Sequence, residues 1–204
     1  MTLKKIIFLL SLPVFAILLI ACSSSKDSDH KEAKKAPQVQ VKQAEHQDIR
    51  AKFEKVTLAK ADSGFTGGTT LEELTDLFGE PASHSTRPAG NVSLDSYVWK
   101  FDQVAVTIDL YENSSILKTI ANFAFQRDLN LSQKEYKKLQ KGMTYAEVKK
   151  LLTEPDNYSQ ASSSDKESLQ AIWISGLKTH TSGANISLSF ENDQLTEMSQ
   201  VGLE

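Results

Sequence analysis

The sequence predicts an α+β fold in which a unit of two helices and an antiparallel meander occurs twice in tandem. Three observations lead to this prediction. A helical motif recurs 74 residues further along the chain, each copy opens with a capping-box pattern, and alternating apolar and polar residues follow each copy. We expect the two units to form one sheet of about six strands with the helices on one face.

The recurring motif predicts one helix in each unit. Residues 68–81 and 142–155 share the pattern Gly-x-Thr-x-x-Glu, followed by apolar residues at helical spacing and a final Glu-Pro. In a capping box the hydroxyl and the Glu each satisfy a free amide at the helix start. The pairs that fit it are Thr70 with Glu73 and Thr144 with Glu147. The first copy closes with Gly79, but the second has Thr153 there, which predicts a strained or differently closed turn.

Another helical segment precedes each motif. Residues 45–56 and 132–140 carry apolar residues at helical spacing. Ser132 and Glu135 fit a third capping box. The order helix, helix, meander is therefore expected in both units.

Two pairs of segments have the composition of strands. The first pair contains Trp99 and Trp173, which are also 74 residues apart, and the second pair alternates apolar and polar residues with a period of two. The segments are 96–101 with 170–175, and 104–110 with 186–190. The turns that follow, each leading into a third strand, match at an offset of 79, which predicts five extra residues in the second unit, near 176–183.

An aromatic row on the first strand is the candidate partner-binding surface. Tyr97, Trp99 and Phe101 share one strand face by alternation, and Trp173 occupies the equivalent position in the second unit. If the row faces away from the helices, it forms an exposed aromatic patch of the kind that anchors protein interfaces. The alternative is that both tryptophans fill the core between sheet and helices, and the sequence leaves the two open.

The first residues predict export and lipid attachment. Lys4 and Lys5 precede an apolar run of about 16 residues, which ends at a lipobox whose cysteine, Cys22, is the only one in the chain. We expect a signal peptide over 1–21 and a diacylglyceryl group on the Cys22 sulfur. The new amino group of Cys22 can carry a third acyl chain. The alternative is an uncleaved signal anchor, which the shortness of the run disfavours.

The remaining chain is expected to form a tether and one compact domain. Residues 22–44 have almost no large apolar side chain, so they cannot offset their ordering entropy and should form a disordered tether. The first unit is assigned to 45–126 and the second to 127–204. Cleavage would change the formal charge from −3 to −5, so the chain has no basic field for nucleic acid.

Searches for catalytic, metal-binding and cofactor-binding patterns give no site. Two Ser-x-x-Lys matches, Ser23 to Lys26 and Ser163 to Lys166, lack the other elements of a penicillin-binding serine. The histidines are interpreted as solvated residues of tether and loops, without zinc-ligand spacing, and are His30, His46, His84 and His180. The glycine-rich segment 64–68 has no lysine for a phosphate loop. The sequence therefore predicts a non-enzyme without metal or cofactor.

Together the repeated helix motif, the Glu-Pro ends and the two strand tryptophans resemble the tandem-repeat fold of the β-lactamase inhibitor protein. They resemble more closely a family of Gram-positive lipoproteins that share this fold, over roughly Phe53 to Leu203. The fold is also similar to a small lipoprotein of the outer-membrane β-barrel assembly machine. The resemblance implies a protein-binding module, since these relatives hold another protein against a sheet face or loop.

The hypothesis for function is a lipoprotein on the outer face of the cell membrane, of Gram-positive type, that binds an envelope or secreted protein or acts as a scaffold. An alternative is a lipoprotein that binds a cell-wall polymer or a small molecule, which a deep apolar pocket with convergent polar groups would favour. A weaker third possibility is an envelope hydrolase.

Overall fold

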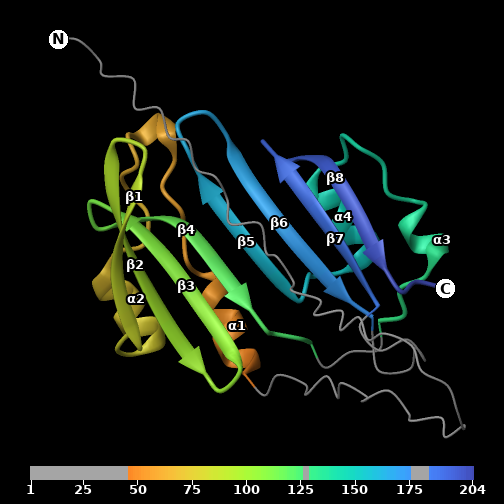
Figure 1. Cartoon of the computed structure of the whole chain (residues 1–204), viewed down its shortest axis with the longest axis horizontal. Helices are drawn as coiled ribbons and strands as arrows, with labels where there is room; N and C mark the ends of the chain where they lie inside the picture. Colours follow the sequence, from red (N-terminus) through yellow and green to blue (C-terminus); the bar gives the residue numbers. More distant parts are fainter. Residues whose placement is uncertain (1–45, 126–128, 176–183) are drawn as a thin grey trace, which may run out of the picture.

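Eight antiparallel strands form a single sheet in which every strand pairs with its neighbours in sequence, from β1 to β8 (Figure 1). The computed structural model describes residues 46–125, 129–175 and 184–204. The strands are β1 (Ser83–Ala89), β2 (Val92–Phe101), β3 (Val104–Tyr111), β4 (Ser114–Ala121), β5 (Asn157–Ser162), β6 (Glu167–Ile174), β7 (Asn185–Glu191) and β8 (Gln194–Val201). The sheet thus has two strands more than the six expected.

The helices lie on one face of this sheet. They are α1 (Gln47–Glu54), α2 (Leu71–Phe78), α3 (Gln133–Tyr136) and α4 (Tyr145–Leu152), with a 3-10 turn, η1, at Ala61–Ser63. In Figure 1, α1, α2 and α4 lie behind the strands and α3 lies beyond the outer edge of β8, and no described helix crosses the front. The mixed fold with helices on one face is therefore confirmed. We call residues 46–125 the first half and residues 129–204 the second half.

Both expected capping boxes are present. The Thr70 hydroxyl accepts a hydrogen bond from the Glu73 amide (3.3 Å), and the Glu73 carboxylate accepts one from the Thr70 amide (2.8 Å). Thr144 and Glu147 make the same pair of bonds (3.2 and 2.9 Å). These bonds satisfy amides that a helix leaves free at its first turn.

The third expected capping box is wrong in detail. The Ser132 hydroxyl accepts from the Lys134 amide (3.2 Å) and itself donates to the Glu135 carboxylate. The helix α3 that follows has only four residues. A helix of one turn consists of end positions only, so a full capping box has no longer helix to stabilise here.

The two tryptophans bind the helix ends to the sheet. Trp99 and Trp173 are 1% and 0% exposed and belong to one apolar core between sheet and helices. The Trp99 indole donates to the Gly79 carbonyl (2.7 Å), and the Trp173 indole donates to the Thr153 carbonyl (3.0 Å). Each buried indole N–H is thereby satisfied at the residue that closes the preceding helix.

The turns at Gly79 and Thr153 have the same backbone conformation. Their φ and ψ values are 81° and −167° at Gly79, and 66° and −161° at Thr153. Positive φ is free of steric cost only for glycine, so Thr153 is strained. Of the two alternatives for the second turn, strain applies rather than a different closure.

The hairpin turns after β3 and β7 also agree, but not at the expected offset. Positive φ values occur at Glu112 and Asn113 in one turn and at Asn192 and Asp193 in the other, an offset of 80. The expected offset of 79 is therefore wrong: from Trp173 to its turn the second half has six residues more than the first half has from Trp99 to its turn. The turns receive the helices alike: Leu71 N donates to Asn113 Oδ1, and Tyr145 N to Asp193 Oδ1.

Strands β4 and β5 join the halves at a seam that α1 covers. The pairs across it are Leu117 with Ala161, Lys118 with Gln160, Thr119 with Ser159 and Ile120 with Tyr158. From α1, Arg50 Nη1 donates to the Asp156 carbonyl (2.8 Å), and from β4 Lys118 Nζ donates to the Val56 carbonyl (2.7 Å). Helix α1 therefore contacts both halves.

The expected signal peptide, Cys22, the tether and the insertion at 176–183 lie outside the described residues. Within the ranges that the structure describes, no helix combines the length and apolarity needed to cross a membrane.

Candidate functional site

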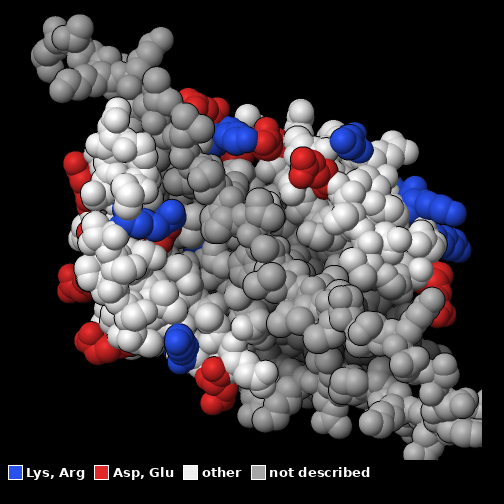
Figure 2. Space-filling model, viewed as in Figure 1, with Lys and Arg blue, Asp and Glu red and all other residues white. Residues whose placement is uncertain are grey.

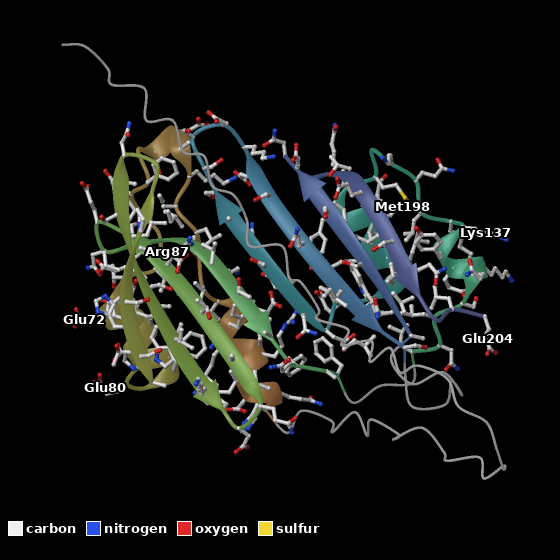
Figure 3. All side chains as sticks on the ribbon, in the orientation of Figure 1. Glu72, Glu80, Arg87, Lys137, Met198 and Glu204 are labelled. Atoms are coloured by element: carbon white, nitrogen blue, oxygen red, sulfur yellow. The ribbon has the colours of Figure 1, made fainter. Side chains whose placement is uncertain are left out.

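The sheet face opposite the helices is the candidate functional site, and we call it the polar face. Strand alternation and the pairing registers place mostly small polar side chains on it. At its middle these are Thr107, Thr119, Ser159, Gln170, Ser187 and Ser199. Figure 3 views the sheet from its polar face, with the side chains drawn as sticks. A broad sheet face of this kind suits contact with another surface more than enclosure of a ligand.

Hydroxyl groups meet where the two halves join. Thr119 Oγ1 and Ser159 Oγ lie 2.7 Å apart on neighbouring strands β4 and β5. Each hydroxyl has both a donor and acceptor capacity, so the pair retains groups for a partner. The polar face can thus form hydrogen bonds across the seam as well as on each side.

Charged groups on this face are few. Arg87 of β1 forms an ion pair with Asp109 of β3, whose side chain is buried. Lys100 and Glu197 stand on outer parts of the face, on β2 and β8. In Figure 2 the coloured charges on the visible described surface lie mainly toward its margins. Recognition here would rest on hydrogen bonds and shape rather than on a strong field.

The aromatic row of the sequence analysis lies on the other face. Trp99 and Trp173 are in the core, and Tyr97 and Phe101 are half-buried and pack against it. Tyr97 is further covered by the His84 ring, stacked at 4.5 Å. The prediction of an exposed aromatic patch at Tyr97, Trp99, Phe101 and Trp173 is therefore wrong, and the core alternative is correct. The amphipathic strands bury their aromatic side because burial of these large rings stabilises the fold most.

The polar residues of the alternating strands were the signal for the site. In β3 and β7 the residues between the apolar ones include Thr107 and Ser187, and these point to the polar face. Sequence alternation could have identified them once the covered face was known. It could not find Ser159, because β5 has no alternating apolar pattern.

The helix side of the sheet also carries a pocket. A cavity of about 310 Å³ is lined by Lys60, Tyr145, Gln160, Glu167, Ser168, Leu169, Phe190 and Asp193. Its charged groups already have partners, since Lys60 Nζ lies 2.8 Å from Glu167 and Asp193 accepts from the Tyr145 amide (3.0 Å). The hydrogen bond that Lys60 donates to the Glu167 carboxylate raises the pKa of Lys60. A ligand site needs polar groups that are available to the ligand. The described charged residues of this cavity are already paired with one another or with the backbone.

Buried cations lie under α1 at the seam. Arg50 and Lys118 are 3% and 5% exposed and face the Phe53 and Tyr158 rings, with Lys118 Nζ 5.2 Å from the Phe53 centroid. Burial lowers the pKa of Lys118 from 10.5 to about 8, against the Glu54 carboxylate and with a further contribution from Arg50. Burial also raises the pKa of Tyr158. These groups fasten α1 to the seam and offer no open reaction site.

The histidines and the Ser-x-x-Lys match have structural uses. His84 lies in β1 rather than in a loop and is 2.9 Å from Asp95, while His46 is 2.8 Å from Asp102. The segment from Ser163 to Lys166 is a turn closed by bonds between these two residues (2.8 and 3.1 Å). In the described ranges, no three His, Cys, Asp or Glu side chains lie close enough together to hold a metal ion.

Comparison with known proteins places this architecture. A family model described as a domain of unknown function with a solved structure, DUF3862, matches residues 45–203. The chain belongs to the DUF3862 family. Its structure is similar to the crystal structure of a protein from Streptococcus mutans provisionally designated a β-lactamase inhibitor protein. The two are 40% identical, the match covers 79% of this chain and 100% of the other, and the TM-score is 0.74. No curated protein matches the chain.

Proposed function

We propose that this DUF3862 protein is a non-catalytic, lipid-anchored module that binds another protein through the polar face. The observation that carries the proposal is the sheet itself, which has helices on one face and a broad row of hydrogen-bonding side chains on the other. Likeness to a protein designated as an inhibitor supports binding rather than catalysis. That designation makes a β-lactamase the first partner class to test.

The platform is built from two copies of one unit of two helices and four strands. Equivalent capping boxes, indole bonds and hairpin turns in the two halves support this part of the proposal. Two joined units extend the polar face over eight strands, which approaches the area of a standard protein interface better than four strands do.

Photo-cross-linking tests the binding face. We expect a benzoylphenylalanine residue at Thr107 or Gln170, both on the polar face, to capture one defined envelope or secreted protein on intact cells. The matched control is Leu151, an α4 residue that is 40% exposed on the helix side. Capture of the same protein at Leu151, recovery of glycan, or no product at either polar position would contradict the proposal.

The anchor is the second part of the proposal. Cys22 would carry the lipid, the outer face of a Gram-positive cell membrane would be the location, and residues 22–44 would lift the domain from it. Each buried lipid CH₂ contributes about 0.8 kcal/mol, so two or more acyl chains hold durably. We expect Cys22→Ala to leave uncleaved precursor or release the protein into the medium. Membrane-bound, acylated protein in this variant would refute the anchor.

A further inference from the structure

Strand β8 forms one edge of the sheet. Among the described residues, no strand pairs with it. Its first part is occupied, because the Leu195 amide donates to the Met143 carbonyl and the Leu195 carbonyl accepts from the Gly142 amide (both 2.8 Å). Residues 197–201 have no neighbouring strand on this edge among the described residues. A strand edge of this kind is a template for another strand.

The two edge strands of the sheet differ in protection. β1 carries Arg87 and Pro88, and charged side chains and proline on an edge discourage pairing. β8 contains no lysine, arginine or proline and a single charge, Glu197. Its last residue, Val201, is 60% exposed, the higher of the two large apolar side chains exposed in the described ranges. The β8 edge is therefore the one open to a partner strand.

Strand alternation identifies the backbone groups that point outward from this edge. Ser175 N donates to the Ala184 carbonyl (2.8 Å), so Ala184 faces β6. The next residue of β7, Asn185, then faces β8, as do Ser187 and Ser189. Their partners are Val201, Ser199 and Glu197. Met198 and Gln200 consequently direct their amides and carbonyls outward.

The first half contains the same edge with a strand already added. Ser115 of β4 makes the two backbone bonds that Leu195 makes in β8, to Thr69 (3.1 Å) and Ala59 (2.8 Å). The register of both hairpins shifts at the same place, after Asp109 and after Ser189, 80 residues apart. Residues 117–120 of β4 therefore correspond to residues 197–200 of β8, and β4 pairs there with β5.

The segment that β4 accepts has the same pattern as β8 itself. In β5 it reads Tyr-Ser-Gln-Ala over residues 158–161, and in β8 residues 198–201 read Met-Ser-Gln-Val. Transferring the seam register to β8 sets Glu197 opposite Val201 of a second copy and Met198 opposite Gln200. Ser199 then meets Ser199 of that copy, so the transferred register is symmetric.

We propose that two copies of the chain pair through β8, antiparallel about a two-fold axis at Ser199, to form one continuous sheet. The hydroxyl contact between Thr119 and Ser159 at the seam (2.7 Å) is the model for the two Ser199 hydroxyls at the axis. Glu197 faces an uncharged residue, so no like charges meet. This dimer goes beyond the proposed function and does not depend on the identity of any partner.

Disulfide trapping tests the axis. Residues directly opposite in a non-hydrogen-bonded pair have Cα atoms about 4.5 Å apart, within disulfide range. We expect the full chain with Ser199→Cys, purified in detergent and mildly oxidised, to give a disulfide-linked dimer. Val201→Cys is the matched control, because its two copies would lie about 14 Å apart along the strands. The unmodified chain, with Cys22 alone, sets the background.

Light scattering supplies an independent readout. We expect the parent chain and Ser85→Lys, a substitution on the other edge strand, to have the mass of a dimer. Ser199→Lys should have half that mass with an unchanged circular dichroism spectrum, since two ammonium groups would meet at the axis. A monomeric parent chain, a dimeric Ser199→Lys variant, or a disulfide at Val201→Cys as abundant as at Ser199→Cys would overturn the proposal.

Discussion

The turn at Gly79 and the turn at Thr153 share one conformation but not one residue type. Both have positive φ, and both present a carbonyl to a buried indole, from Trp99 and Trp173. An added Cβ at Gly79 would have no heavy atom within 4 Å beyond its chain neighbours, so its cost would be intrinsic to the backbone. The packed strand and helix therefore impose this conformation, even on a β-branched residue that disfavours it.

The largest effect should come from removing either indole. We expect Trp99→Ala and Trp173→Ala each to lower the free energy of unfolding by about 3–5 kcal/mol, because each leaves a large cavity and an unbonded carbonyl. Urea unfolding followed by circular dichroism measures this. Since β4 and β5 join the halves, both variants should retain one transition. Separate transitions, with only one of them shifted in each variant, would show that the halves fold independently.

The next effect concerns Lys118, which pairs with Ile108 of β3 as Met198 pairs with Leu188 of β7. The folded-state pKa of Lys118 is about 8, below its unfolded value of 10.5. The unfolded chain therefore binds more protons between these values, and the cost of burying the charge, present below pH 8, is relieved as pH rises. This contributes up to about 3 kcal/mol of added stability by the upper value.

Comparing the parent chain with Lys118→Met from pH 7 to 10 isolates this contribution. The free energy of unfolding of the parent should rise relative to that of the variant. Buried Tyr145 and Tyr158, whose pKa values are raised, are common to both chains and cancel in the difference. Parallel pH profiles would contradict a lowered pKa at Lys118.

The smallest effect is the exchange of the turn residues. We expect Thr153→Gly to raise the free energy of unfolding by about 1 kcal/mol and Gly79→Thr to lower it by about 1–2 kcal/mol. Thr153→Ala separates the loss of side-chain contacts from backbone relief, because alanine retains the strain. Chemical denaturation checks all three variants. A Thr153→Gly variant no more stable than Thr153→Ala would argue against strain at this turn.

Sequence patterns predicted the elements whose local chemistry is strong. The capping threonines Thr70 and Thr144 mark their helices because a hydroxyl and a Glu three residues later bond locally. Strands β1 and β5 were missed because Ser-His-Ser-Thr-Arg-Pro-Ala and Asn-Tyr-Ser-Gln-Ala-Ser carry little apolar alternation. They are strands because neighbouring strands bond to them, which is a tertiary effect.

The candidate site was harder to predict than the fold. Alternation separates Trp99 from Val98 and Lys100 on β2, but it does not tell which side the helices cover. That depends on how α2 and α4 dock, and the indole bonds to Gly79 and Thr153 settle it. The offset of the second hairpin was also missed, since turn residues were matched by similarity rather than by backbone conformation.

The meander order has a consequence for how the chain assembles. Every strand bonds only to strands adjacent in sequence, so most pairings close short loops at little entropic cost; the exception is β4 with β5, whose connection runs over residues 122–156. The bond from Arg50 to the Asp156 carbonyl is different, because it joins residues 106 positions apart. The contacts of α1 across the seam can therefore form only once β5 lies beside β4, and they then hold the two halves in a common structure.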